Sequence, residues 1–342
     1  MRAVVFDAHG DSDRLHLAEL PDPVPRAGEV RVRVRAVALN RLDLWVRIGW
    51  KGLDLPKPHV LGSDVAGVVD VVGAEVVGIS PGDEVVLGPG LGCGRCGECL
   101  RGRDNYCGQY HILGETVRGG YADLVVVPAR NIFKKPATLS FVEAACLPLV
   151  FTTAWGMLVE RTGLRAGEWV LVHAAGSGVG SAAIQVAKLL GATVIATAST
   201  DEKLARAAAL GADHTINYAH EDFARRVREM TDKRGVDVVF EHTGGDTFDG
   251  SLRALAVGGR LVTCGATSRP QAELDIRRLF ARQLTIYGHT MGSLAAMLPT
   301  LEHAATGRFK PVLDRTMPLT EARAAHEVLA HRAQFGKVVL VP

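Results

Sequence analysis

Two hydrophobic patterns divide the chain. In the first third, short segments alternate polar and apolar residues, as a half-buried strand does. The clearest is Arg31-Val-Arg-Val-Arg-Ala-Val37, and residues 65–72 and 82–87 form further short strands, separated by glycines and Pro81. Short strands with this punctuation are typical of a small barrel or sandwich.

Near residue 150 the pattern changes to apolar runs that alternate with helical segments. Buried strands are expected at 169–173, 193–197, 236–240 and 259–264. Helices are expected from about Ser181 to Leu190 and from Asp201 to Leu210, each followed by a glycine. Strands alternating with helices indicate βαβ units and a parallel sheet. The tail, residues 336–341, is again a strand.

Composition narrows the class of protein. The 342 residues are 47% hydrophobic and carry a formal net charge of +2, which gives no argument for nucleic acid or an anionic membrane. The length suggests about two domains by the usual ~150-residue prior. The N-terminus is charged too early for a signal peptide, and no apolar run approaches the ~20 residues of a membrane helix. We therefore expect a soluble, cytoplasmic protein that acts on a small molecule.

Four of the six cysteines cluster within fifteen residues, with the spacing Cys-x2-Cys-x2-Cys-x7-Cys. Without a secretion signal such a cluster favours a metal over disulfides. Four thiolates close a tetrahedral zinc shell and leave no position for substrate, so we expect one structural zinc rather than an iron–sulfur centre or free thiols. The expected ligands are Cys93, Cys96, Cys99 and Cys107. Cys146 and Cys264 fall in apolar segments and are expected in the core.

A glycine-rich turn joins the strand at 169–173 to the next helix. It departs from the G-x-G-x-x-G fingerprint at the first two glycines, but small residues between a strand and a helix still let a pyrophosphate approach a helix N-terminus. The expected phosphate-binding residues are Ala175, Gly176, Ser177, Gly178, Val179 and Gly180.

The tip of the second strand of this unit, Thr197 to Thr200, carries no acid. An NAD site usually has an acidic residue there that binds the ribose hydroxyls. Asp201 and Glu202 come slightly late, and Ser199 to Glu202 also fits a capping box. A neutral tip with Ser199, Thr200 and Lys203 would tolerate a 2′-phosphate, so we expect NADP(H) in preference to NAD(H). Lys203 is equally well read as a solvated helix residue.

These motifs together resemble the medium-chain dehydrogenase/reductase superfamily over essentially the whole chain. Pro58-His-Val-Leu-Gly-Ser-Asp-Val-Ala-Gly-Val-Val69 is similar to that family's P-x-x-x-G-H-E-x-x-G-x-V segment, and Pro81-Gly-Asp-Glu-Val85, the cysteine lobe, Gly119-Gly-Tyr-Ala-Asp123 and Ala144-Ala-Cys-Leu-Pro148 follow in the family's order. The resemblance implies an α/β protein: a GroES-like β-barrel catalytic domain (1–149 and 289–342, with the zinc lobe at about 90–110) and a Rossmann doubly wound parallel-sheet domain (150–288). It also implies an active site in the cleft between the domains and a homodimer or homotetramer.

The departures from the family pattern carry the functional expectation. In the zinc alcohol dehydrogenases of the family, the catalytic metal is held at positions that match Asn40, Ser63 and Leu149 here, and Asp64 stands where the family has glutamate. None of the three supplies a thiolate or an imidazole. Leu42 replaces the hydroxyl that begins the proton relay. The segment Asn40-Arg-Leu-Asp43 instead resembles zinc-free quinone oxidoreductases and enoyl reductases, which lack the zinc lobe, and the Gly-Ser-Asp segment is similar to crotonyl-CoA-type reductases.

The resulting prediction is an NAD(P)H-dependent reductase of an activated carbon–carbon double bond or a quinone. Charge building on the substrate's carbonyl oxygen can be held by a few hydrogen-bond donors. Asn40 is the first candidate donor, although a turn residue closing its strand is the plain interpretation, and Asp43 is expected to orient the loop. His111, beside Tyr110, and His289 are candidate proton donors. His173, His242, Gly265 and Gly288 lie at strand ends, where the cofactor is expected.

Two alternatives stay open. The protein could be an alcohol dehydrogenase that binds a catalytic zinc through unusual ligands such as Asp43, His59 or Asp64; it would then hold two zinc ions instead of one. It could also be non-catalytic and use NADPH for stability or sensing.

Overall fold

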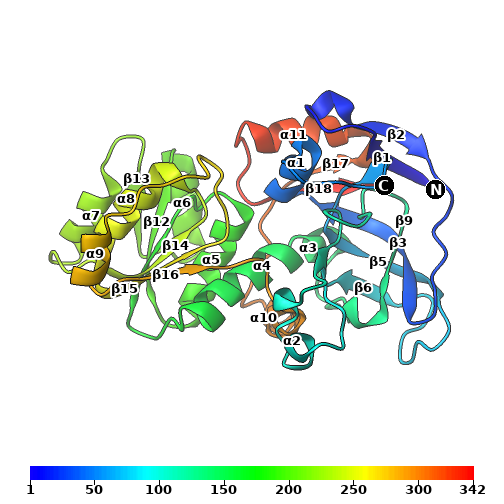
Figure 1. The fold of residues 1–342 in the computed structure, drawn as a ribbon, viewed down its shortest axis with the longest axis horizontal. Coiled ribbons are helices and arrows are strands. Elements are labelled where there is room, and N and C mark those ends of the chain that lie inside the picture. Colours follow the sequence, from blue (N-terminus) through cyan, green and yellow to red (C-terminus); the bar gives the residue numbers. More distant parts are fainter. The chain divides into compact units, whose positions relative to one another are not determined.

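The structure is a computed structural model that describes all residues, 1–342. The chain forms two compact units (Figure 1). The first unit contains Met1–Leu149 and Ser293–Pro342, and the second contains Val150–Gly292. The chain thus returns to the first unit at Ser293, where the sequence suggested residue 289.

The first unit is built on antiparallel strands. A three-stranded sheet has the order β2-β1-β4, and a seven-stranded sheet has the order β10-β6-β5-β3-β18-β17, with β9 paired to β3. The strands are β1 (Arg2–Phe6), β2 (His16–Glu19), β3 (Glu29–Ala38), β4 (His59–Val60), β5 (Asp64–Val72), β6 (Glu84–Leu87), β9 (Leu124–Pro128), β10 (Ile132–Lys134), β17 (Leu313–Pro318) and β18 (Lys337–Val341). The path of the larger sheet ends at β10 and β17, so the GroES-like fold is present without a ring of paired strands that closes.

The alternation of β3 explains its place at the centre of this sheet. Val30, Val32 and Val34 are buried in the core of the unit. On the other face, Arg31 Nε and Arg33 Nη2 donate to the two carboxylate oxygens of Asp70 at 2.7 and 3.0 Å. The period of two therefore sends the valines inward and lets the arginines pair across to β5.

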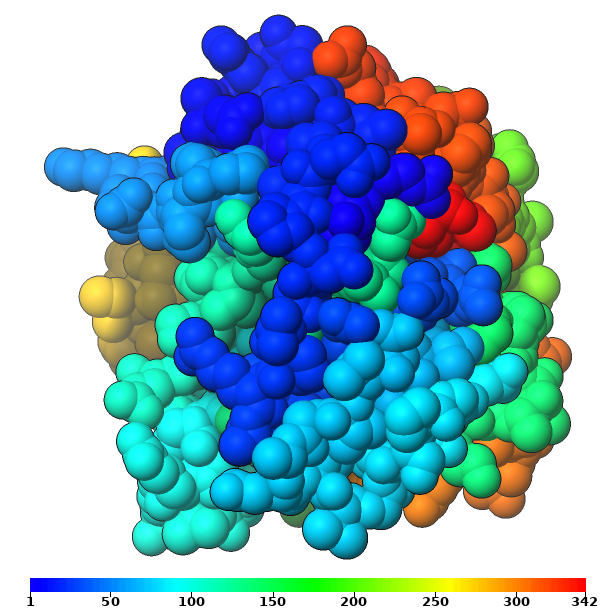
Figure 2. Space-filling view, turned by 90° about the vertical axis from the view of Figure 1, so that its right-hand side faces the viewer, coloured from blue at the N-terminus to red at the C-terminus, as the bar shows by residue number.

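The C-terminal segment completes the first unit. Its strand β18 pairs with β3 and β17, and Arg323 Nη2 of α11 donates to the carbonyl of Asp13 at 2.8 Å. Figure 2 shows the N-terminal residues in blue beside the C-terminal residues in orange and red on one face. The helices of the unit are α1 (Arg41–Ile48), α2 (Gly97–Leu100), α3 (Phe141–Ala145), α10 (Met297–Ala305) and α11 (Ala322–Ala330), and α4 (Pro148–Trp155) leads into the second unit.

The second unit is a six-stranded parallel sheet of order β13-β12-β11-β14-β15-β16. Its strands are β11 (Trp169–Val172), β12 (Thr193–Ala198), β13 (His214–Asn217), β14 (Val236–Glu241), β15 (Leu255–Thr263) and β16 (Thr285–Gly288). They alternate with α5 (Gly178–Leu189), α6 (Asp201–Ala209), α7 (Phe223–Met230), α8 (Gly245–Ala254) and α9 (Ile276–Ala281). The strand order reverses beside β11, which makes the carboxyl end of β11 the switch point of a Rossmann sheet.

The predicted elements are confirmed, with shifted boundaries. Strand β15 begins at Leu255, four residues before the expected 259, because its first residue pairs with Val236 before an irregularity in the ladder. The capping box at Ser199 is wrong: Thr200 is the N-cap of α6 and accepts from the N–H of Lys203, so Glu202 is in the first turn and closes no box. None of the helices combines the length and the apolar character that crossing a bilayer requires.

Candidate functional site

The four clustered cysteines come together in one lobe of the first unit. The lobe contains the short pair β7 (Gly90–Leu91) and β8 (His111–Ile112) with α2 between them. The four sulfur atoms lie within 4.8 Å of one another, and the Sγ atoms of Cys93 and Cys99 are 4.0 Å apart. Zinc–sulfur bonds of about 2.3 Å place the sulfurs of a tetrahedral site about 3.8 Å apart. The lobe therefore fits one zinc ion with all four positions filled by protein.

Backbone N–H groups of the lobe point at the sulfur atoms. The N–H groups of Cys96 and Gln109 lie 3.3 Å from the Sγ atoms of Cys93 and Cys107 respectively. Hydrogen bonds from the N–H groups of Arg95 and Cys96 lower the pKa of Cys93 to about 6. These donors stabilise thiolates, which is the form that binds a metal.

The unusual zinc ligands of the alcohol dehydrogenase alternative do not converge. The cysteine lobe is the one group of three or more histidine, cysteine or acidic side chains whose ligand atoms meet. His59 is fully buried, with its ring edge on Phe6 and its Nε2 3.3 Å from the carbonyl oxygen of Gly114. Asp43 and Asp64 make other bonds, which the next paragraphs describe.

Two of the three positions that match catalytic zinc ligands contact the carboxylate of Asp64, and the third precedes it in the chain. The backbone N–H of Leu149 donates to its Oδ1 at 2.7 Å, and the side-chain amide of Asn40 donates to its Oδ2 at 2.9 Å. Ser63 is the residue directly before it and is fully buried. Asn40, Asp64 and Lys337 form what we call the buried polar centre.

Lys337 supplies the positive charge of this centre, and the sequence analysis missed it. It is the first residue of β18, and its side chain is 3% exposed. Its Nζ lies 2.8 Å from Oδ2 of Asp64 and 2.5 Å from Oδ1 of Asn40. A lysine directly before an apolar strand was the available signal, but only the pairing of β18 with β3 brings it to Asn40.

Asp43 anchors the backbone around the buried polar centre. Its two carboxylate oxygens accept from the N–H groups of Asn40 and Gly62, at 2.7 and 3.0 Å. Burial raises its pKa to about 7 against the opposing effect of these bonds. These contacts are those of a residue that orients the loop, and they tie the start of α1 to the segment before β5.

Two hydroxyl groups in the first unit are buried without a hydrogen-bond partner, Oγ of Ser63 and Oη of Tyr110. Burial raises the pKa of Tyr110 above its usual range. His111 is exposed on β8 with its Nδ1 2.9 Å from Oγ1 of Thr116, and no hydrogen bond or ion pair joins it to Asn40 or Asp43. A buried donor without an acceptor is costly, so the Ser63 hydroxyl stands out as a group that a ligand could satisfy.

The glycine-rich turn of the second unit has the geometry of a phosphate cradle. Ala174 has a positive φ of 46°, and Ser177 is the N-cap of α5, with Oγ accepting from the N–H of Gly180 at 2.9 Å. A Cβ at Gly180 would lie 2.5 Å from the carbonyl oxygen of Ala174. Gly180 thus allows close helix–strand packing, while Gly176, Gly178 and Val179 lead into a helix N-terminus whose first N–H groups lack intrahelical acceptors. The residues fit a dinucleotide.

The tip of β12 presents hydroxyls rather than a free acid. Ser199 is half-buried, and Oγ1 of Thr200 is used as the cap of α6. The nearest acid, Asp201, accepts from the side-chain amide of Asn217 at 2.8 Å. Lys203 is half-buried in the first turn of the helix.

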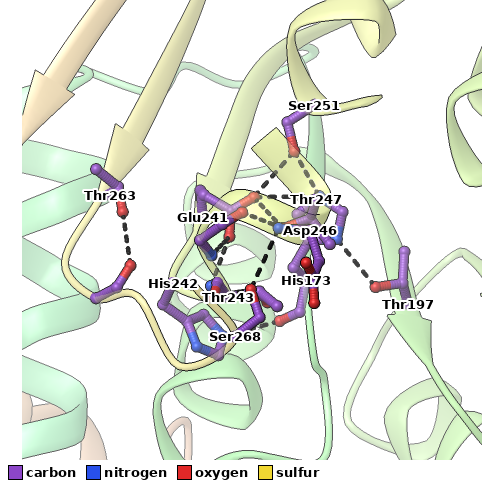
Figure 3. A network of polar contacts seen from close by, with 12 residues as sticks. His173, Thr197, Glu241, His242, Thr243, Asp246, Thr247, Ser251, Thr263 and Ser268 are labelled. Atoms are coloured by element: carbon purple, nitrogen blue, oxygen red, sulfur yellow. Dashed lines mark hydrogen bonds and ion pairs between the residues drawn. The ribbon is translucent and has the colours of Figure 1, made fainter. Parts of the chain in front are cut away.

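A buried polar network ties together the carboxyl ends of β11, β12 and β14 (Figure 3). Glu241 is fully buried, and Oγ1 of Thr247 and Oγ of Ser251 donate to its Oε2 at 2.8 and 3.0 Å. His173 lies between Ser251 and Thr197, with its Nε2 and Nδ1 at 2.9 and 3.2 Å from their hydroxyl oxygens. Burial lowers the pKa of His173. The network fixes the edge of the sheet at which the turn lies.

The other strand-end residues differ in their surroundings. Nε2 of His242 is 3.0 Å from the carbonyl oxygen of His173 and 3.4 Å from Oγ of Ser177, so it supports the turn. His289 follows β16; burial lowers its pKa to about 4, and its Nε2 is buried without a partner. Gly265 accepts from Oγ1 of Thr263 at 3.2 Å, and Gly288 has open space where a side chain would be.

Two family models match this chain. A zinc-binding dehydrogenase model matches residues 178–306, and an alcohol dehydrogenase GroES-like domain model matches residues 26–137. Among curated proteins, the NAD-dependent alcohol dehydrogenase of Saccharolobus solfataricus is 32% identical over 96% of both chains. The acryloyl-coenzyme A reductase of Metallosphaera sedula is 33% identical over 99% of both.

A solved structure shares the whole fold. The crystal structure of an NAD-dependent alcohol dehydrogenase covers 100% of both chains with a TM-score of 0.97 and 52% sequence identity. The relatives thus include proteins named for alcohol oxidation and a protein named for reduction of an unsaturated thioester.

Proposed function

Since the chain belongs to the medium-chain dehydrogenase/reductase superfamily of oxidoreductases, we propose that it reduces an activated carbon–carbon double bond or a quinone without a catalytic zinc. One observation carries the proposal. Asn40 and Leu149, two of the three zinc-ligand positions, contact Asp64, which forms an ion pair with Lys337, and Asn40 is bonded to both Asp64 and Lys337.

The buried polar centre is electrically complete without a metal ion. The carboxylate of Asp64 accepts from Lys337, Asn40 and the backbone of Leu149. A second cation at the same carboxylate would face the ammonium at short range, and Asn40, Ser63 and Leu149 supply no thiolate or imidazole to offset the repulsion. This arrangement favours chemistry that needs no Lewis acid.

The substrate class follows from that requirement. A nicotinamide cofactor, when bound, supplies a hydride. Addition to the β-carbon of an enone or enoyl thioester moves negative charge to the carbonyl oxygen, and hydrogen-bond donors of the protein can hold it there. An unactivated ketone or alcohol lacks this route.

Ser63 is a better candidate donor than Asn40. The amide of Asn40 already donates to Asp64, and its oxygen accepts from Lys337. The Ser63 hydroxyl is fully buried and has no partner. We therefore assign the oxyanion contact to Ser63, with Asn40 as a second donor through its remaining N–H and Asp43 as the residue that orients Asn40. His111 remains the proposed proton donor.

We also propose one structural zinc ion and a preference for NADP(H). Cys93, Cys96, Cys99 and Cys107 would hold the zinc, and its role is to order the lobe. The cofactor preference rests on the neutral tip of β12, where Asp201 is already bonded to Asn217. Ser199, Thr200 and Lys203 are the proposed contacts of the 2′-phosphate.

Zinc-dependent alcohol oxidation with NAD is the second candidate function. It is favoured by the names of two relatives, one of them 52% identical. The convergence of Asp64 on Lys337 rather than on other ligands argues against it.

One screen separates the candidates. The purified protein is assayed for NADPH and NADH oxidation with enoyl-CoAs, simple enones and quinones, and for NAD(P)⁺ reduction with simple alcohols. Reduction of enones or quinones that survives mild chelation supports the proposal. Alcohol oxidation lost on chelation and restored by zinc supports the second candidate. Inactivity with every substrate, despite NADPH binding, favours a non-catalytic protein.

A further inference from the structure

A cavity lined by basic side chains lies on the helical side of the second unit. Its volume is about 470 Å³. Its lining residues lie on or directly after the helices α7, α8 and α9, which are labelled in Figure 1. It is lined by six basic residues and one acid together with Ala224: Arg225, Arg228, Lys233, Arg253, Arg278, Arg282 and Glu229. The whole chain carries a net charge of only +2, so this concentration of positive charge is local.

Acidic neighbours neutralise half of these basic side chains. Arg225 Nε donates to Glu229 at 2.8 Å, and Asp249 accepts from Arg253 at 3.1 Å and from Arg278 at 2.5 Å. These three arginines are therefore fixed in place by ion pairs.

The other three basic side chains have no carboxylate partner. No hydrogen bond or ion pair engages the side chain of Arg228 or Lys233. Arg282 donates from Nη2 to the carbonyl oxygen of Leu255 at 2.7 Å, but its Nε is buried with no acceptor. Burial lowers the pKa of Arg282, and the positive charges of Arg228 and Arg278 lower it further.

Helix dipoles explain the positions only in part. Arg228 and Arg253 lie in the last turns of α7 and α8, where a cation is favoured by the helix dipole. Such an exposed cation is satisfied by water. The dipole does not explain a buried guanidinium N–H without an acceptor beside two further positive charges, since a buried unpaired donor is destabilising.

The cavity is distinct from the dinucleotide turn. Arg282 follows α9 and lies beside the first residues of β15. Its carbonyl oxygen accepts from the N–H of Gly258, and its side chain donates to the carbonyl oxygen of Leu255. The turn at Gly176–Gly180 lies instead at the carboxyl end of β11. In a parallel sheet the amino and carboxyl ends of the strands form opposite edges.

We propose that this cavity binds a diphosphate group, held by Arg228, Lys233 and Arg282. Three cationic side chains from two segments, the end of α7 with the turn after it and the turn after α9, suit a compact anion with several oxygens. Guanidinium groups bind phosphate oxygens in pairs. The volume exceeds the needs of a single inorganic ion, which leaves room for an organic substituent such as a nucleoside.

The test is calorimetric titration of the full-length protein with inorganic phosphate, pyrophosphate and ADP, with the dinucleotide site saturated by NADPH. We expect one equivalent of pyrophosphate or ADP to bind with NADPH present, and orthophosphate to bind at least about tenfold more weakly. Tighter binding of ADP than of pyrophosphate would identify a nucleotide as the source of the group. Displacement of the anion by NADPH, or no binding at all, overturns the proposal.

Variants locate the site. The double variant Arg228→Gln/Lys233→Gln removes no ion pair of the folded protein and should weaken pyrophosphate binding by about tenfold or more. Arg228→Lys keeps the charge but loses the paired N–H donors, so it should weaken binding less than the double variant does. Lys51→Gln/Arg308→Gln, which removes the same charge from exposed positions of the first unit, is the matched control. Equal weakening by both double variants would show only a general charge effect and contradict the assignment.

Discussion

The cysteine lobe and the buried polar centre lie in the same unit but differ in how their negative charge is compensated. The lobe brings four sulfur atoms within 4.8 Å, three of them on half-exposed residues, with no cationic side chain among the ligands. The buried polar centre places Asp64 and Lys337 at 2.8 Å in the interior, with Asn40 between them. The sulfur atoms of the lobe suit a bound cation, whereas the carboxylate of the buried polar centre is already paired with an ammonium group.

Because of this difference, the structural metal site and the catalytic metal site of a zinc-type fold have to be considered separately. Four thiolates crowded together repel one another unless a cation joins them, so the chemistry of the lobe supports the proposed zinc site. At the buried polar centre the lysine ammonium provides the compensating charge that a metal provides elsewhere. Membership of the superfamily therefore does not decide how many metals the chain binds; the partners of each carboxylate and thiolate do.

Removal of the lobe's metal should have the largest effect. We expect Cys96→Ser to lower the zinc content well below one equivalent and to lower the melting temperature, because the binding free energy of a structural metal is also folding free energy. The measurements are metal analysis and calorimetry of the same sample. Cys264→Ser, outside the lobe, is the control and should keep its zinc. Two equivalents of tightly bound zinc in the wild type would contradict the proposal that the chain binds one zinc ion, at the lobe.

Breaking the ion pair of the buried polar centre should come next. Lys337→Met leaves Asp64 charged and without its cation in the interior, and we expect it to lower the free energy of unfolding by about 3–5 kcal/mol. Lys337→Met/Asp64→Asn removes both charges and should recover a large part of the loss. Denaturant titration of the wild type, both single variants and the double variant measures the coupling. A coupling near zero would mean that the pair does not neutralise itself.

Ser63→Ala tests whether the unpartnered hydroxyl acts on the substrate. We expect kcat to fall by about 10²–10³-fold, as for the loss of one oxyanion donor. Stability should change by less than about 1 kcal/mol, since no hydrogen bond of the folded protein is lost. Asn40→Ala should lower activity by about ten- to a thousand-fold and also lower stability, because it breaks two contacts of the centre. An active Ser63→Ala enzyme would return the donor role to Asn40.

Lowering the pH should test whether buried titratable groups outside the buried polar centre stay uncharged in the folded protein. Burial lowers the pKa of His326 to about 3, and its Nε2 lies 3.3 Å from Oη of Tyr121. As the pH falls below the unfolded value of about 6.5, only the unfolded chain takes up this proton, so the contribution to stability is lost between about pH 6.5 and 3. The raised pKa of Asp43 acts oppositely and stabilises the fold as the pH falls from about 7 toward 4.

A variant isolates the histidine from these opposing effects. Between pH 7 and pH 5, His326→Gln should lose about 2 kcal/mol less stability than the wild type in urea titrations. Identical pH slopes for both proteins would show that His326 takes up its proton equally in the folded and unfolded chains, so that its pKa is not lowered in the fold.

The smallest expected effect is that of replacing Lys203 in the second unit, whose proposed partner is the 2′-phosphate of the cofactor. Lys203→Ala should weaken NADPH binding by about tenfold and leave NADH nearly unchanged, because only NADPH carries the 2′-phosphate. Fluorescence titration with both cofactors measures it. Equal losses, or a wild-type preference for NADH, would remove Lys203 from the site.

Local sequence patterns predicted most of the features that depend on residues close together in the chain. The alternation in residues 31–37 identified β3, and the spacing of the cysteines identified a group that the fold does bring together. The N-cap of α6 was placed one residue early because Ser199 and Thr200 are both good caps, and only the backbone decides between them. Such neighbouring choices are settled by packing rather than by type of residue.

Only part of the buried polar centre was predicted from the sequence. Asn40, Ser63 and Leu149 were singled out for the ligands they lack, but what fills their place was not foreseen. Lys337 is far away along the chain, and a lysine is usually exposed. Neither periodicity nor spacing carries information about which charges meet in a folded interior.

The long separation of Asp64 and Lys337 has a consequence for how the protein is made. The two residues are 273 positions apart in the chain. At about 5–20 residues per second of synthesis, on the order of 14–55 seconds pass between their appearances on the ribosome. During that interval Asp64 has no ammonium partner, and β3 has no β18 beside it. The first unit therefore begins to form early but can close its interior only after the last strand has been released.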